Sequence, residues 1–227
     1  MSKPIASSAI RGAHQIAEQA QELLVRAIRA KGRASKVEFP NTGYYLPIIY
    51  SMTGVPVRTL GQMREILAQS EHIRQLAEKY SGAEHFLYIG RKYQYPLALE
   101  GALKLKEIAY IHAEGYAAGE MKHGPIALID PKFPTMALAP EDGSYEKVIS
   151  NIQEIRAREG KIVAITSAGN TKLGSLVDDV IEIPRNHEIL TPLLSVIPLQ
   201  LFAYHCAVIR GCDVDKPRNL AKSVTVE

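Results

Sequence analysis

The segment His85–Ala109, HFLYIGRKYQYPLALEGALKLKEIA, decides the fold of this chain. Its first part, HFLYIGR, is a short apolar run of the kind found in strands buried on both faces of a sheet. The part that follows predicts a helix in which positions 100, 104 and 107 share one face, because residues three and four apart stack along a helix. A buried strand followed by a helix is the unit from which parallel α/β sheets are built.

The same alternation continues toward the C-terminus. Three further apolar runs predict strands: FPTMALAP (133–140), KIVAIT (161–166) and DDVIEIP (178–184). Helices are predicted over Tyr145–Glu159 and Leu190–Arg210. The expected fold is therefore α/β, with a parallel sheet covered by helices on both faces. Ligands of such sheets bind at the carboxyl ends of the strands, where the loop Gly90–Tyr95 and the segment Ser167–Thr171 fall.

The N-terminal quarter has a different pattern. A helix is predicted over Ser8–Lys31, with Gly32 as its stop signal, and a second helix over Leu60–Tyr80. Between them, VEFPNTGYYLPIIYSMTG contains prolines and glycines that interrupt every regular period. The N-terminal region is thus expected to be mainly helical and separate from the sheet.

Composition excludes several classes of protein. The 227 residues carry a net charge of only +3 and no dense Lys/Arg stripe, which argues against nucleic-acid binding. Cys206 and Cys212 form no zinc-type pair, so we expect free thiols in a reducing cytoplasm and no bound metal. The start MSKPIASSAIRGAH lacks the apolar core of a signal peptide. The apolar stretch Ile189–Ile209 is interrupted by Pro192 and Pro198 and predicts a buried helix, not a membrane span.

The candidate functional residues lie on the first helix and after it. Glu100, Lys104 and Glu107 place two acids and an amine on one helix face, and His123 follows in a His-Gly-Pro turn. Such groups can move protons on a small polar substrate. A solvated helix face with ordinary ion pairs and a simple turn histidine remain the alternatives. The spacing Glu120-x-x-His123 occurs once, whereas di-iron bundles need two such motifs.

Two long motifs resemble a known family. They are YPLALEGALKLKEIAYIHAEGYAAGEMKHGP (95–125) and the tail DVDKPRNLAKSVTVE (213–227). Both resemble the isomerase part of glucosamine-6-phosphate synthases, over about residues 66–227. The resemblance implies a sugar isomerase (SIS) domain at 66–212, which is a three-layer α/β/α sandwich with a flavodoxin-like sheet, and an active-site tail at 213–227. The family has two such domains in tandem, and the match is to the second.

The resemblance also implies roles for individual residues. Glu107 would transfer the proton between neighbouring carbons of the sugar, and Lys104 would lie beside the sugar hydroxyls. His123 would assist ring opening in the site of a neighbouring subunit. Lys222 would form a Schiff base with the ketose, since an imine makes the neighbouring C–H more acidic. Substrate contacts are implied for three further residues, Arg218, Glu100 and Ala221.

The first 65 or so residues resemble a different protein. The block EFPNTGYYLPIIY (38–50) is similar to the N-terminus of the acetyl-CoA synthase subunit of carbon monoxide dehydrogenase/acetyl-CoA synthase. Nickel–iron–sulfur chemistry needs several thiolates, and both cysteines lie outside this block. We therefore interpret residues 1–65 as a packing or dimerisation segment, joined to the SIS domain by gene fusion.

These resemblances lead to one expected function and two alternatives. We expect a sugar-phosphate isomerase half-site acting on fructose 6-phosphate toward glucosamine 6-phosphate, without a cofactor, in a homo-oligomer or paired with another SIS domain. Activity is expected to be impaired, because the family's phosphate-binding Ser/Thr loop and its glutaminase domain have no counterpart in the sequence. The alternatives are a non-catalytic sugar-phosphate-binding or assembly module and, remotely, an acetyl-CoA synthase fragment.

Overall fold

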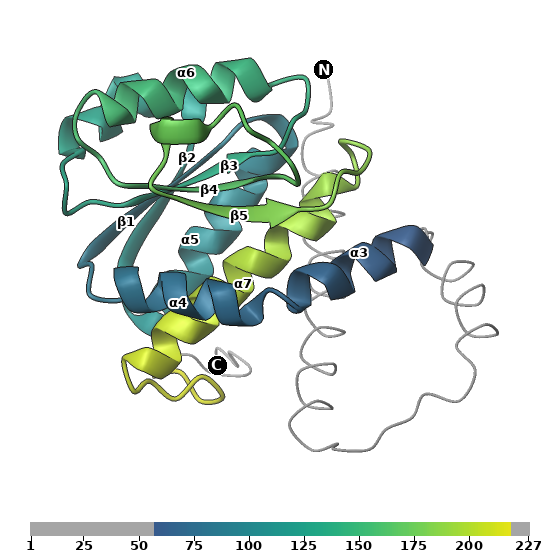
Figure 1. The fold of residues 1–227 in the computed structure, drawn as a ribbon. Coiled ribbons are helices and arrows are strands. Elements are labelled where there is room, and N and C mark those ends of the chain that lie inside the picture. Colours follow the sequence, from purple (N-terminus) through teal and green to yellow (C-terminus); the bar gives the residue numbers. More distant parts are fainter. Residues whose placement is uncertain (1–56, 219–227) are drawn as a thin grey trace, which may run out of the picture. The chain divides into compact units, whose positions relative to one another are not determined.

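A computed structural model describes residues 57–218 (Figure 1). The chain divides into two compact units, Met1–Val57 and Arg58–Glu227, and the described residues belong almost entirely to the second. The predicted helix Ser8–Lys31 lies outside the described residues, and the domain boundaries at residues 65 and 212 stay predictions.

A five-stranded parallel sheet forms the centre of the second unit, in the order β2-β1-β3-β4-β5. The strands are β1 (His85–Gly90), β2 (His112–Ala117), β3 (Thr135–Ala139), β4 (Ile162–Ser167) and β5 (Asp179–Ile183). The register places His85 beside His112 and Leu87 beside Thr135. The prediction of a parallel α/β sheet is confirmed.

Helices cover both faces of this sheet, as Figure 1 shows. They are α3 (Val57–Leu67), α4 (Ser70–Tyr80), α5 (Tyr95–Ala109), α6 (Tyr145–Arg156) and α7 (Thr191–Ile209). Phe86 and Tyr88 of β1 belong to the core formed with α4, α5 and α7, whereas Leu87 and Ile89 belong to the core formed with α6. Successive side chains of a strand point to opposite faces, so a strand buried on both sides must be apolar throughout.

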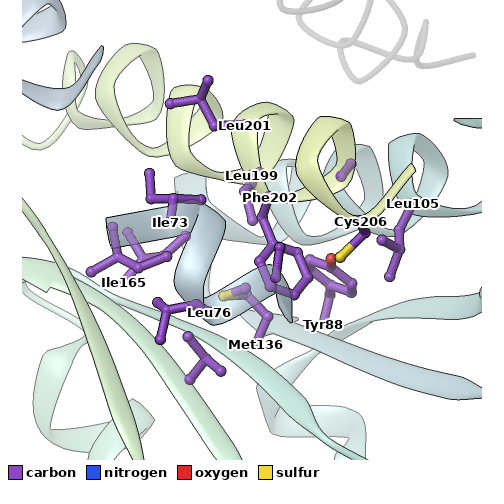
Figure 2. Close-up of a cluster of buried hydrophobic side chains, with 14 of the residues drawn as sticks. Ile73, Leu76, Tyr88, Leu105, Met136, Ile165, Leu199, Leu201, Phe202 and Cys206 are labelled. Carbon is purple, nitrogen blue, oxygen red and sulfur yellow. The ribbon is translucent and has the colours of Figure 1, made fainter. Parts of the chain in front are cut away.

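The longest helix of the described residues, α7, is the centre of the larger core. Leu199, Phe202 and Cys206 project from α7 toward Tyr88 of β1 and Leu105 of α5 (Figure 2). Among the described residues, α7 is the one helix long and apolar enough to span a membrane, and 61% of its apolar window is buried inside the protein. This agrees with the prediction of a buried helix over Leu190–Arg210.

The structure corrects three details of the sequence interpretation. The expected single helix over Leu60–Tyr80 is two helices, α3 and α4, which are divided at Ala68–Gln69. The helix α6 ends at Arg156, three residues before the predicted end. The sheet has five strands where the sequence predicted four.

The missed strand is β2, an edge strand with the polar sequence HAEGYA. An apolar run was not needed there, because the interior residues of an edge strand are less completely buried. A Cβ atom on Gly115 would lie 2.7 Å from Cα of Leu99, so glycine lets α5 pack directly onto this strand. The glycine that weakened the strand signal is therefore required by the tertiary packing.

Candidate functional site

The helix α5 carries the candidate site. It begins after Gln94 with Pro96 in its first turn and ends at Tyr110, whose φ of 56° is left-handed. A Cβ on Gly101 would lie 2.8 Å from the Tyr88 ring and 3.0 Å from Leu199, so α5 is seated closely between the sheet and α7. The opposite side of the helix exposes Leu99, Leu103 and Lys106, and its other charged residues are partly exposed.

Glu100, Lys104 and Glu107 form one charge cluster on α5. The Lys104 Nζ atom lies 2.7 Å from Oε2 of Glu107 and 3.8 Å from Oε1 of Glu100. The side chains of Glu100 and Lys104 are 17% exposed and that of Glu107 is 26% exposed. The structure thus brings together the three helix residues that the sequence singled out. It holds a partly shielded lysine between two partly exposed carboxylates.

The C-terminal segment approaches the end of the same helix. The backbone N–H of Arg218 donates a hydrogen bond to Oη of Tyr110 at 2.8 Å, and the Arg218 guanidinium lies 4.1 Å from the centre of the Tyr110 ring. Lys222 and Ala221 lie outside the described residues. Tyr110 was not identified from the sequence, and the one signal that could have suggested it is a tyrosine where a helix C-terminus favours glycine.

His123 lies in a different part of the fold. It ends the short 3₁₀ helix η2 (Ala118–His123), which follows β2, and its side chain is 73% exposed. Its Nδ1 atom lies 2.7 Å from Oε2 of Glu120. Ala118 and Met121 of η2 belong to the core on the α6 face, whereas α5 belongs to the core on the other face.

The topology therefore separates His123 from Glu107. Helix α5 runs back along the sheet after β1, so Glu107 lies near the amino ends of the strands. The six residues of β2 then return about 20 Å to the carboxyl ends, where η2 begins. Within one chain, His123 therefore lies away from the charge cluster of α5.

A polar network that sequence reasoning missed holds η2 in place. Nε and Nη2 of Arg91 donate to Oδ1 of Asn151 at 3.1 and 3.0 Å, and the buried Asn151 donates to Glu154. Glu154 pairs with Lys122 at 2.9 Å. A Cβ on Gly119 would lie 3.3 Å from the Arg91 guanidinium, which therefore packs against η2. Isolated polar residues in a sequence give no signal of such a network.

The turn after β4, which lies at the carboxyl end of the sheet, is occupied by internal contacts. The backbone N–H of Gly169 donates to Glu182 at 3.0 Å, and the Asn170 amide donates to Tyr145 and Thr166 at 2.7 and 2.8 Å. These donors already form hydrogen bonds within the domain. Between residues 57 and 218, His, Cys, Asp and Glu side chains form no group of three that could hold a metal ion.

Comparison with known proteins identifies the family. The SIS domain profile matches residues 79–210, which include the whole sheet and α5. This chain belongs to the SIS domain family. A glutamine–fructose-6-phosphate aminotransferase (isomerising) of Bacteroides thetaiotaomicron is 54% identical over 183 residues, which are 81% of this chain and 29% of the relative. The Thermus thermophilus enzyme of the same name is 57% identical over 165 residues, 73% of this chain and 27% of the relative.

Solved SIS domain structures support the same assignment. The C-terminal domain of the glucosamine-fructose-6-phosphate aminotransferase of Francisella tularensis is 41% identical, with a TM-score of 0.65 over 70% of this chain and 45% of that one. Tagatose-6-phosphate ketose/aldose isomerase of Escherichia coli, at 15% identity and a TM-score of 0.62 over 80% of this chain and 52% of that one, shares the fold alone. This SIS domain chain spans under a third of the length of the curated relatives above, at 29% and 27%.

The N-terminal region matches a second family profile. The N-terminal domain of the carbon monoxide dehydrogenase alpha subunit matches residues 21–114. This match overlaps the SIS domain match over residues 79–114 and so reaches into β1, α5 and β2 of the SIS fold. The second resemblance seen in the sequence is therefore also confirmed at the level of the family.

Proposed function

We propose that α5 carries part of a sugar-phosphate isomerase site that converts a ketose phosphate to an aldose phosphate, of the kind found in glutamine–fructose-6-phosphate aminotransferases. The observation that carries the proposal is the Glu100–Lys104–Glu107 cluster, in which a lysine lies between two partly exposed carboxylates. The similarity of the chain to synthases at 52–57% identity supports the choice of fructose 6-phosphate and glucosamine 6-phosphate as ligands. No step of this chemistry requires a cofactor.

Each residue of the cluster has a proposed task. Glu107 accepts a proton from C1 of the open-chain ketose and returns it to C2, passing through an enediol, which requires a carboxylate that reaches both carbons. Lys104, whose ammonium already holds Glu107 at 2.7 Å, orients that carboxylate and contacts the sugar hydroxyls. Glu100 balances the lysine charge from the preceding turn and contacts the substrate.

The tail supplies the remaining groups in this proposal. Lys222 follows Arg218 by four residues, a span of at most about 14 Å in extended chain, which allows it to reach the cluster from the Tyr110 contact. Its amine would attack the ketose carbonyl and release water to form an imine, and hydrolysis of that imine would free the open-chain ketose on which Glu107 acts. Arg218 and Ala221 are proposed to contact the substrate from the same segment.

His123 is proposed to serve a neighbouring site. It lies on the face of the sheet opposite to α5, so another SIS domain, from a second copy of this chain or from a related chain, would have to present a charge cluster to it. This favours an oligomer as the working form, and we propose the cytoplasm as its compartment. The same separation also favours a second candidate function, a non-catalytic module that binds sugar phosphate or assembles with other SIS domains.

The test is chemical trapping of the ketose. The chain is incubated with fructose 6-phosphate and sodium borohydride, which reduces an imine to a stable secondary amine, and the modified lysine is located by peptide mass spectrometry. Modification of Lys222 that is lost in Lys222→Arg supports the isomerase site. Binding of fructose 6-phosphate by calorimetry without trapping or isomerisation supports the binding module. If the chain shows neither binding of fructose 6-phosphate nor trapping, both candidate functions are refuted.

A further inference from the structure

Tyr110 makes an unusual double contact with the start of the C-terminal segment. Its hydroxyl oxygen accepts the backbone N–H of Arg218 at 2.8 Å, and its ring lies under the Arg218 guanidinium at 4.1 Å. A backbone contact and a side-chain contact to the same residue fix both its position and its direction. The two residues are 108 positions apart in the sequence, so this contact exists only in the folded domain.

The backbone of Tyr110 is itself unfavourable. Its φ of 56° and ψ of 32° are left-handed, a conformation that glycine adopts without steric cost and other L-residues rarely adopt. Helices commonly end on glycine in this conformation. A tyrosine at this position runs against the local preference for glycine, and strained positions of this kind cluster at functional sites.

Tyr110 lies close in the chain to the charge cluster of α5. Tyr110 follows Glu107 by three residues, which is less than one helical turn, and it ends the helix that carries the charge cluster. We propose that Tyr110 is a positioning residue. It holds Arg218 at the C-terminal end of α5, so that the segment carrying Lys222 starts beside the cluster. This role rests on the proposed isomerase site. It acts through Arg218, without a contact between Tyr110 and substrate.

Arg218 holds the C-terminal segment to the domain through the same two contacts. Its guanidinium covers the Tyr110 ring and its backbone N–H is bound to the hydroxyl, so both of its strong contacts hold the segment to the domain. A guanidinium that turned to a phosphate would have to leave the ring. Arg218 therefore anchors the segment in this arrangement, and it contacts the substrate only after such a move.

The first experiment measures hydrogen–deuterium exchange of peptides from residues 213–227 in the full chain. Tyr110→Phe removes the acceptor and keeps the ring, and exchange should rise about fivefold, the effect of one net hydrogen bond. Tyr110→Leu also removes the cation–π contact, and exchange should rise about twentyfold. Arg218→Ala removes the cation–π contact but keeps the backbone N–H donor, and exchange should rise about threefold. Peptides from β4 should not change. Tyr204→Leu, at an exposed tyrosine of α7, is the matched control.

A glycine variant separates positioning from general stability. Tyr110→Gly removes both contacts but relieves the left-handed backbone, so the midpoint of thermal unfolding should change little while exchange of the 213–227 peptides rises about twentyfold. A purely structural tyrosine would show the reverse, a lowered midpoint with unchanged exchange. Unchanged exchange of these peptides in both Arg218→Ala and Tyr110→Gly would overturn the inference.

Borohydride trapping then tests the link to the site. In this reaction the Lys222 amine and the ketose carbonyl form an imine with loss of water, and borohydride delivers hydride to the imine carbon. Trapping should be about tenfold slower in Tyr110→Leu than in Tyr204→Leu, because the lysine starts from a less restricted position. If the wild-type chain is not trapped, the proposed isomerase site is refuted. The exchange data still show whether Tyr110 anchors the C-terminal segment. Equal trapping rates in the two variants would refute the link.

Discussion

The charge cluster on α5 predicts a specific loss of stability when its central charge is removed. In Lys104→Met, Glu107 loses a partner at 2.7 Å and Glu100 loses one at 3.8 Å, while the aliphatic part of the side chain remains. Exposed ion pairs contribute at most about 1 kcal/mol each. Side chains that are only 17–26% exposed here justify the upper part of that range, so we expect a loss of about 1.5 kcal/mol for the two contacts together.

The assay is thermal unfolding followed by circular dichroism. For a domain of this size, a loss of about 1.5 kcal/mol lowers the midpoint by about 3–6 °C. The control is Lys106→Met on the same helix, an exposed lysine that forms no ion pair among the residues the structure describes. Its midpoint should change by less than about 1 °C.

Two further results would test the electrostatic cause. Adding Glu107→Gln to Lys104→Met should recover part of the loss, because the double variant no longer leaves that carboxylate unpaired. The difference between the two lysine variants should also shrink in 1 M salt, where the Debye length falls to about 3 Å. Equal midpoints for Lys104→Met and Lys106→Met would refute the reasoning.

Three other predictions follow from buried positions. Gly101→Ala should cost about 1–3 kcal/mol in denaturant unfolding, because the new Cβ would lie 2.8 Å from the Tyr88 ring; Gly61→Ala, with open space, is its control. Burial lowers the pKa of His205 below 6.5, so the unfolded chain binds a proton at this residue at a higher pH than the folded chain does. The free energy of unfolding should therefore fall as the pH drops below about 6.5, and His205→Gln should remove this pH dependence. Burial raises the pKa of the Cys206 thiol to about 12, so a thiol reagent should modify Cys212 in the native protein and Cys206 only after unfolding; equal rates would contradict this.

Much of the domain could be predicted from local patterns. The apolar runs predicted four of the five strands, and the spacing of Glu100, Lys104 and Glu107 predicted their common helix face. These signals are readable because the period of 2 in strands and of 3.6 in helices is set by the backbone itself. The separation of the expected helix over Leu60–Tyr80 into α3 and α4 was not readable, because no proline or glycine stands at the break.

The sequence by itself determined four of the five strands, the helix with its charged face and the membership of the SIS domain family. Only the tertiary structure decided which elements meet. The polar edge strand β2 exists because Gly115 admits α5, Arg218 meets Tyr110 across the fold, and the core packing sends His123 and Glu107 to opposite faces. The reason is physical: backbone periodicity is local, whereas these contacts join residues that only the packing of helices on both faces of the sheet brings near or keeps apart.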